Sequence, residues 1–194
     1  MIYTIIGNGE SRKDIIIKNI PGIRVGCNGI YLHDNVEMIC AMDKFWRDKI
    51  VQETRIPIIS RYTNTIFQGN LQTYNYQEQE WQNLLTPYRN YCSGTSALDH
   101  ISNISTKDDY IFLIGFDFDY TGNKVNHIYK DTKFHPNSNR KAQDEGKFLK
   151  QTIEILNRYC RNYCWVTDSN MHLKNSISIK TKEFIRNICK SNSH

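Results

Sequence analysis

The chain has 194 residues, of which 39% are hydrophobic and 23% charged, a balance typical of a globular protein about the size of one domain. No apolar run approaches the roughly 18 residues of a membrane span, and no basic, apolar leader is present, so we expect neither a span nor a secretory signal. The formal net charge of +5 fits an anionic ligand, and six scattered cysteines without a zinc pattern favour a reducing, cytoplasmic location.

Short apolar runs bounded by Gly, Asn and Asp alternate with amphipathic stretches along the chain. The apolar runs predict six buried strands, at Tyr3–Ile6, Arg24–Cys27, Met38–Met42, Ile56–Ile59, Tyr110–Ile114 and Tyr163–Val166. The amphipathic stretches predict helices at Lys44–Glu53, Thr95–Ile104, Ala142–Arg161 and Lys180–Lys190. This order predicts an α/β fold, a three-layer Rossmann-like domain with a mostly parallel sheet.

We expect one domain over residues 1–194, interrupted by two polar insertions at about 62–91 and 122–139. Long irregular insertions are often binding loops, and the second is a candidate for a lid-like loop. In the longest predicted helix, a stripe of side chains on one face is expected to pack into the core: Phe148, Leu149, Ile153, Leu156 and Cys160.

Polar residues follow the first three predicted strands. Glycines on both sides of Asn8 would let the backbone approach a ligand closely, although the third glycine of a dinucleotide fingerprint is missing. Asn28 follows the second strand and Asp43 the third. An Asn side chain can donate to and accept from a base edge or a ribose. These strand ends predict one shared crevice, and a tight turn without a ligand is the alternative for Gly7–Gly9.

Two later segments add polar groups to this crevice. Ser93, Gly94 and Thr95 precede or begin a helix, and the free N–H groups there suit a phosphate or carboxylate, with an ordinary N-cap as the alternative. Asp117 and Asp119 follow the fifth strand, and we expect them not to ligate a single metal ion together. The alternative for Asp117 is that it holds neighbouring backbone amides.

Five segments occur in the order of a known family: IIGNGESRK, VGCNGIY, ICAMDKFW, SGTSAL and YIFLIGFDFDYTG. Over roughly residues 1–156 the chain resembles the bacterial sialyltransferases of glycosyltransferase family 42. It is also similar to Rossmann-like domains typified by archaeal hydroxymethylpterin pyrophosphokinases and to open reading frames of tailed phages. The resemblance implies a transferase that uses a nucleotide-sugar donor, with no cofactor and no metal.

The resemblance also implies roles for individual residues. The implied donor-binding set contains Gly7, Asn8, Gly9, Asn28, Gly29, Asp43, Arg89, Ser93, Gly94, Thr95, Asp117, Asp119, Tyr120 and Tyr129. The family typically has Asn where Asp43 stands, and a phosphate-binding Tyr where Asp119 stands, so Tyr120 or Tyr129 would have to take over. Arg89 lies one residue out of register with the family's Arg.

The catalytic base that the family keeps after its fifth strand corresponds to His135, with His127 as the competing candidate. We therefore expect an inverting, metal-independent glycosyltransferase acting on a glycan or, as in the phage relatives, on a hydroxymethylated base of DNA. Two alternatives stay open. One is a Mg²⁺-dependent pyrophosphokinase or other phosphotransferase with Asp43, Asp117 or Asp119 as metal ligands, and the other is a noncatalytic nucleotide-binding module.

Overall fold

The computed structural model describes residues 1–60, 91–118, 128–129 and 145–191. Within these residues seven strands form one sheet in the order β4-β3-β2-β1-β5-β6-β7, and every neighbouring pair is parallel. The strands are β1 (Ile2–Ile6), β2 (Ile23–Cys27), β3 (Met38–Cys40), β4 (Ile58–Ile59), β5 (Tyr110–Ile114), β6 (Asn162–Val166) and β7 (Ser176–Ile179). The strand order reverses between β1 and β5, which makes their carboxyl ends the topological switch point of the sheet.

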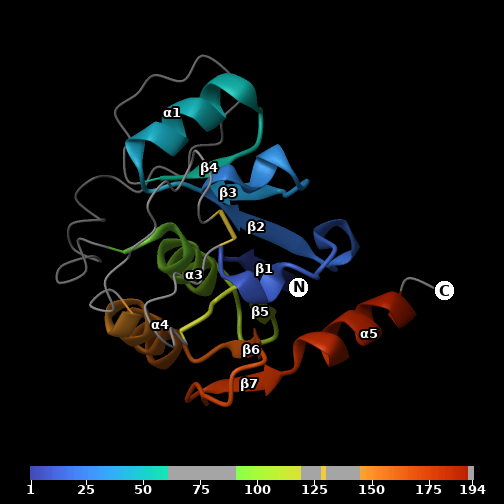
Figure 1. Cartoon of the computed structure of the whole chain (residues 1–194). Coiled ribbons are helices and arrows are strands. Elements are labelled where there is room, and N and C mark those ends of the chain that lie inside the picture. The colour runs from blue at the N-terminus through green and yellow to red at the C-terminus, as the bar shows by residue number, and fades with distance from the viewer. Residues whose placement is uncertain (61–90, 119–127, 130–144, 192–194) are drawn as a thin grey trace.

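The described residues also form four α-helices and three short 3-10 helices. The α-helices are α1 (Lys44–Glu53), α3 (Ser93–Ile104), α4 (Glu145–Tyr159) and α5 (Thr181–Ser191). The 3-10 helices are η1 (Glu10–Arg12), η2 (Ile17–Asn19) and η3 (Asn28–Leu32). Figure 1 shows α3 and α4 on one side of the sheet and α5 on the other.

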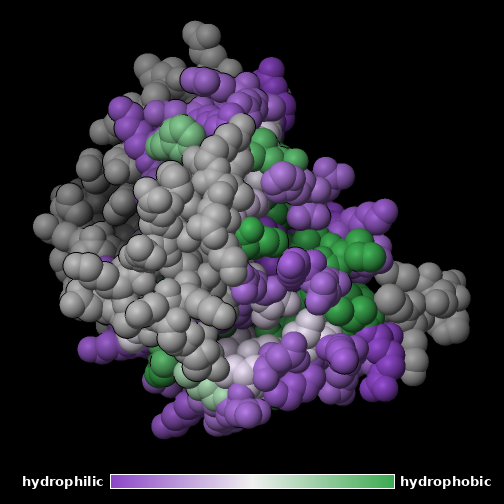
Figure 2. Space-filling view, viewed as in Figure 1, coloured by the Kyte–Doolittle hydropathy of each residue, from purple (hydrophilic) through white to green (hydrophobic). Residues whose placement is uncertain are grey.

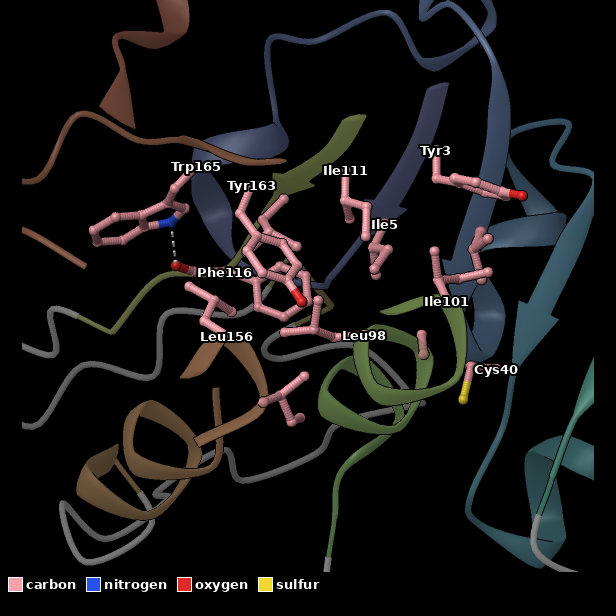
Figure 3. Packing of buried hydrophobic residues seen from close by; sticks show 14 of the residues in the cluster. Tyr3, Ile5, Cys40, Leu98, Ile101, Ile111, Phe116, Leu156, Tyr163 and Trp165 are labelled. Atoms are coloured by element: carbon pink, nitrogen blue, oxygen red, sulfur yellow. Dashed lines mark hydrogen bonds between the residues drawn. The ribbon is translucent and has the colours of Figure 1, made fainter. Parts of the chain in front are cut away.

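The two faces of the sheet are covered by separate sets of apolar side chains because successive residues of a strand point to opposite faces. Ile5 and Leu113 pack under α3 and α4, and Figure 3 shows Ile5 in this layer together with Leu98 of α3 and Leu156 of α4. Ile6 and Ile114, the next residue of each strand, pack on the opposite face with side chains of η3, α1 and α5. The three-layer α/β fold predicted from the sequence is thereby confirmed.

Several predicted elements differ in detail from the structure. β7 was not predicted, and α3 begins at Ser93 instead of Thr95. Cys160 was predicted to face the core but is exposed, because α4 ends at Tyr159 and Cys160 takes a positive φ of 50°. Ile155, which is fully buried, belongs to the apolar face instead.

Large apolar side chains are also exposed at scattered positions, including Ile16, Phe45 and Ile177. On the face drawn in Figure 2, apolar residues gather in small patches that are separated by polar ones. No helix among the described residues is long and apolar enough to span a membrane.

Candidate functional site

The turn after β1 touches the turn after β5 at the switch point. Gly7 donates its N–H to the Ile114 carbonyl at 2.8 Å, and Gly9 donates to the Gly115 carbonyl at 2.9 Å. Gly115 has a φ of 68°, and a Cβ placed on Gly7 would lie only 2.4 Å from the Gly115 oxygen. Both turns therefore need glycine, because a side chain on Gly7 would push the two backbones apart and one on Gly115 would be strained.

The Asp117 side chain binds the segment that follows the first of these turns. Its Oδ2 accepts a hydrogen bond of 2.8 Å from the Ser11 N–H, at the start of η1. The preceding residue, Phe116, is fixed by its carbonyl, which accepts a 3.0 Å hydrogen bond from the Trp165 indole N–H (Figure 3). The alternative raised for Asp117 on the sequence, that it holds a neighbouring backbone amide, is confirmed, and its role toward a ligand stays untested.

Asn8 lies between the two glycines of the first turn. Its carbonyl accepts a 2.8 Å hydrogen bond from the Ile128 N–H, which attaches residues 128–129 to the turn. Its side-chain Oδ1 is buried and has no hydrogen-bond partner among the described residues. A buried carbonyl oxygen without a donor is costly, so Asn8 offers a bound molecule an unused acceptor.

A chain of hydrogen bonds joins the ends of β2 and β3 to the start of α3. The Met42 N–H donates to Ser93 Oγ at 3.2 Å, and Ser93 Oγ donates to Asn28 Oδ1 at 2.8 Å. Asn28 has a φ of 53°, a left-handed conformation that Asn adopts more readily than most residues. With its oxygen held by Ser93, the Asn28 amide is oriented and its two N–H groups are the ones that a ligand can use.

The first turn of α3 combines free N–H groups with a missing side chain. The first intrahelical bond runs from the Ser96 N–H to the Cys92 carbonyl, and no side chain caps the helix. A Cβ on Gly94 would make only ordinary contacts, the nearest being 3.4 Å from the Phe116 ring. The fold therefore does not require glycine at position 94. Because Gly94 has no side chain, the start of the helix is open to an anion.

Two other predicted positions, Thr95 and Gly29, have structural roles, whereas Asp43 has an exposed side chain. The Thr95 hydroxyl is buried, where it donates to the Cys92 carbonyl at 3.2 Å and contacts Gln151 Oε1 at 3.3 Å. Gly29 makes room for Trp46, whose ring would lie 2.6 Å from an added Cβ. Asp43 is the exposed N-cap residue of α1, and its side chain makes no capping hydrogen bond.

Tyr129 does not stand alone near the first turn, because it binds Arg12, a residue that the sequence did not single out. Arg12 Nη2 donates to the Tyr129 hydroxyl at 3.2 Å, and the guanidinium lies 5.9 Å from the centre of the Tyr129 ring. Burial raises the pKa of the Tyr129 phenol, and Arg12 opposes that shift.

Burial also raises the pKa of the Cys27 thiol, so Cys27, just before Asn28, is neutral.

The remaining predicted residues lie outside the described ranges: Arg89, Asp119, Tyr120, His127 and His135. Among the residues that are described, no group of three or more His, Cys, Asp or Glu side chains is arranged to hold a metal ion. Among the described residues, Ser93 at the start of α3 binds Asn28, and Asn8 follows β1, the strand that pairs with β2.

An all-parallel sheet with its polar groups at the switch point defines a Rossmann-like α/β protein. No protein-family model matches the chain, and no curated protein matches it. Among solved structures it is similar to the monofunctional α-2,3-sialyltransferase Cst-I from Campylobacter jejuni, with a TM-score of 0.50 and 15% sequence identity, over 99% of this chain and 94% of that one. At this identity the likeness shows only that the two proteins share this fold.

Proposed function

We propose that this protein is a glycosyltransferase that moves a sugar from a nucleotide-sugar donor to a hydroxyl group of its acceptor. The observation that carries the proposal is the 2.8 Å hydrogen bond between Ser93 and Asn28, which brings two separate polar segments together at the carboxyl edge of the sheet. Asn8 lies at the neighbouring strand end with an unused acceptor. Ligands of open α/β sheets bind in this place.

The proposed reaction is a direct displacement at the anomeric carbon. The acceptor oxygen attacks the anomeric carbon as the bond from that carbon to the phosphate oxygen breaks, so the sugar inverts and the nucleotide leaves with the electron pair. The N–H groups and dipole at the start of α3 stabilise the charge that builds on the phosphate, which supports a reaction without a metal. We assign the acceptor proton to His135, with His127 as the alternative; both lie outside the described residues.

The acceptor in this proposal is a hydroxyl of a glycan or of a hydroxymethylated DNA base, met in the cytoplasm of a bacterium or of a phage-infected host. The net charge of +5 suits either a DNA substrate or an anionic donor. A DNA acceptor would reveal itself through transfer that falls steeply as salt is raised, because contacts to phosphates release counterions. Transfer to a glycan would depend on salt only weakly.

Ligand-induced thermal stabilisation tests the proposal directly. The wild-type chain is heated with CMP, UDP, GDP and ADP and their sugar conjugates, each with Mg²⁺ and with EDTA. We expect one nucleotide series to raise Tm, because a ligand bound only to the folded state stabilises it by mass action. Ser93→Ala should reduce that rise, since Asn28 loses the hydroxyl that orients it. A full screen without any shift would refute the proposal.

Turnover separates this proposal from the two alternatives. A glycosyltransferase releases free nucleotide from the sugar conjugate in EDTA, and His135→Ala should abolish release while leaving the nucleotide-induced rise in Tm in place. Activity that EDTA abolishes would instead indicate the phosphotransferase. Binding without turnover in the wild-type chain would indicate the noncatalytic module.

A further inference from the structure

Arg12 is a buried cation with no anionic partner among the residues that the structure describes. Its side chain belongs to a residue that is only 3% exposed, its Nε is buried without a hydrogen-bond partner, and no described carboxylate pairs with it. Arg47, which is also buried, pairs with Asp48, and the partly buried Arg24 pairs with Glu37. Arg12 therefore differs from Arg47, the other arginine that is buried among the described residues.

This arrangement costs stability in the free protein. A charged group removed from water loses its hydration, and only a partner of opposite charge and well-placed hydrogen bonds offset that loss. The Tyr129 hydroxyl supplies one hydrogen-bond partner and its ring supplies a cation–π contact, but neither carries a negative charge. Four of the five N–H groups of the guanidinium have no protein acceptor among the described residues, so they are available to bind an anion.

Arg12 lies beside the turns that carry the two asparagines. Its N–H is 3.4 Å from the Gly9 carbonyl, so it stands one turn of η1 after the first glycine turn. Its partner Tyr129 follows Ile128, whose N–H binds the Asn8 carbonyl at 2.8 Å. The positive charge of Arg12 also lowers the pKa of the Cys27 thiol, although burial raises that pKa by more. Cys27 directly precedes Asn28 in the chain.

We propose that Arg12, oriented by Tyr129, binds an anionic group of the molecule that occupies the strand ends, a phosphate or a carboxylate distinct from the phosphate at the start of α3. The fork of the guanidinium would accept two oxygens of such a group, as planar guanidinium groups commonly do. The proposal rests on the proposed function only for the identity of the remaining ligand. If the donor is a nucleoside diphosphate sugar, the group is its second phosphate; if it is a monophosphate linked to an acidic sugar, the group is the carboxylate of that sugar.

Calorimetric titration of the full chain with inorganic pyrophosphate tests Arg12 without a nucleotide. We expect Arg12→Met to weaken binding at least about tenfold, because one charge-assisted pair is lost. Arg12→Lys should fall between, since it keeps the charge but not the fork. Arg186→Met, which removes an exposed charge on α5, is the matched control and should bind like the wild-type chain.

Stability separates anion recognition from a structural role. Without ligand, Arg12→Met should melt at or above the wild-type Tm, because an unneutralised buried charge is replaced by an apolar side chain of similar length. A lower Tm with unchanged pyrophosphate affinity would mean that Arg12 only supports Tyr129, and would overturn the proposal. If Arg12→Met does not fold, Arg12→Lys and Tyr129→Phe decide the question: wild-type affinity in both overturns it.

Nucleotide titrations identify the anionic group and keep the two proposals apart. Dependence on Arg12 for a nucleoside diphosphate, but not for its monophosphate, assigns the second phosphate. Dependence only for a monophosphate linked to an acidic sugar assigns the carboxylate. If neither series depends on Arg12, this inference fails while the proposed function stands. If pyrophosphate binding depends on Arg12 and no nucleotide binds, the inference stands and the proposed function fails.

Discussion

Gly94 and Gly146 both occupy the second position of a helix, but their surroundings differ. Gly94 follows Ser93, the first residue of α3, which binds Asn28, whereas Gly146 is an exposed residue of α4 with nothing within 4 Å of an added Cβ. Alanine should stabilise either helix by up to about 1 kcal/mol, because glycine loses more backbone entropy on folding.

We predict that Gly94→Ala weakens nucleotide binding about tenfold or more while Tm stays level or rises, because the new methyl group obstructs a phosphate at the helix start. Gly146→Ala, the control, should raise Tm and leave affinity unchanged. Thermal melts and calorimetric titration measure both quantities. Wild-type affinity in Gly94→Ala would show that no ligand approaches α3 closely.

Asn28 combines a backbone requirement with a side-chain function, and two substitutions separate them. Both Asn28→Gly and Asn28→Ala remove the amide that Ser93 binds, but only glycine adopts a φ of 53° without strain. We expect the glycine variant to have the higher free energy of unfolding, by about 1 kcal/mol. Nucleotide affinity should fall equally in both, and urea unfolding with titration would reveal any departure from this pattern.

The sequence predicts that Asn8, Asn28 and Ser93 lie at one edge of the sheet, because each follows a strand or begins a helix and parallel strands end at the same edge. It does not predict Arg12. An arginine in a polar turn is typical of exposed surface, and its burial depends on Tyr129, which is 117 residues further along the chain. Long-range contacts of this kind leave no local pattern, and the same holds for the hydrogen bond between Asp117 and Ser11.

At the scale of elements, α3 buries a histidine that makes folding sensitive to pH. Burial lowers the pKa of His100 to about 4, against an ordinary value near 6.5. Between these pH values His100 is protonated in the unfolded chain but neutral in the folded chain. The free energy of unfolding therefore falls as pH is lowered from about 6.5 to about 4.

We expect the His100→Gln variant to lack this part of the acid destabilisation, which amounts to at most about 3 kcal/mol. The comparison is between urea unfolding curves of the two proteins from pH 7 to pH 4, in which the contributions of all other groups cancel. Near pH 7, where His100 is neutral in both the folded and the unfolded chain, the difference in free energy of unfolding between the two proteins should not change with pH. Parallel curves at lower pH as well would show that His100 is protonated equally in the folded and unfolded chains.

Elements with a continuous apolar run or a clear apolar face were predictable, whereas the exposed edge strand β7 was not. The six predicted strands are apolar runs buried on both faces, and α4 shows a clear apolar side. β7 was missed because its four residues, Ser-Ile-Ser-Ile, form an edge strand with Ile177 exposed, so it lacks the continuous apolar character of a central strand. It exists because β6 offers it a parallel partner.

At the scale of the whole molecule, the sheet depends on the close contact between Gly7 and Gly115. A Cβ on Gly115 would lie 2.8 Å from the Gly7 oxygen, at a backbone φ of 68°. We predict that Gly115→Ala lowers the free energy of unfolding by about 2 kcal/mol or more, since left-handed strain and the backbone clash add together. Denaturant unfolding measures this loss, and an unchanged midpoint would contradict it.

The strand order also divides the sheet between two contiguous stretches of chain. Residues 1–60 supply β4, β3, β2 and β1, residues 91–191 supply the other three strands, and α3 from the second stretch packs over β1, β2 and β3 of the first. Asn28 and Ser93 thus come from opposite sides of a seam. A chain cut between the two stretches would recover its candidate site only when the pieces reassemble, so binding would itself report successful fragment complementation.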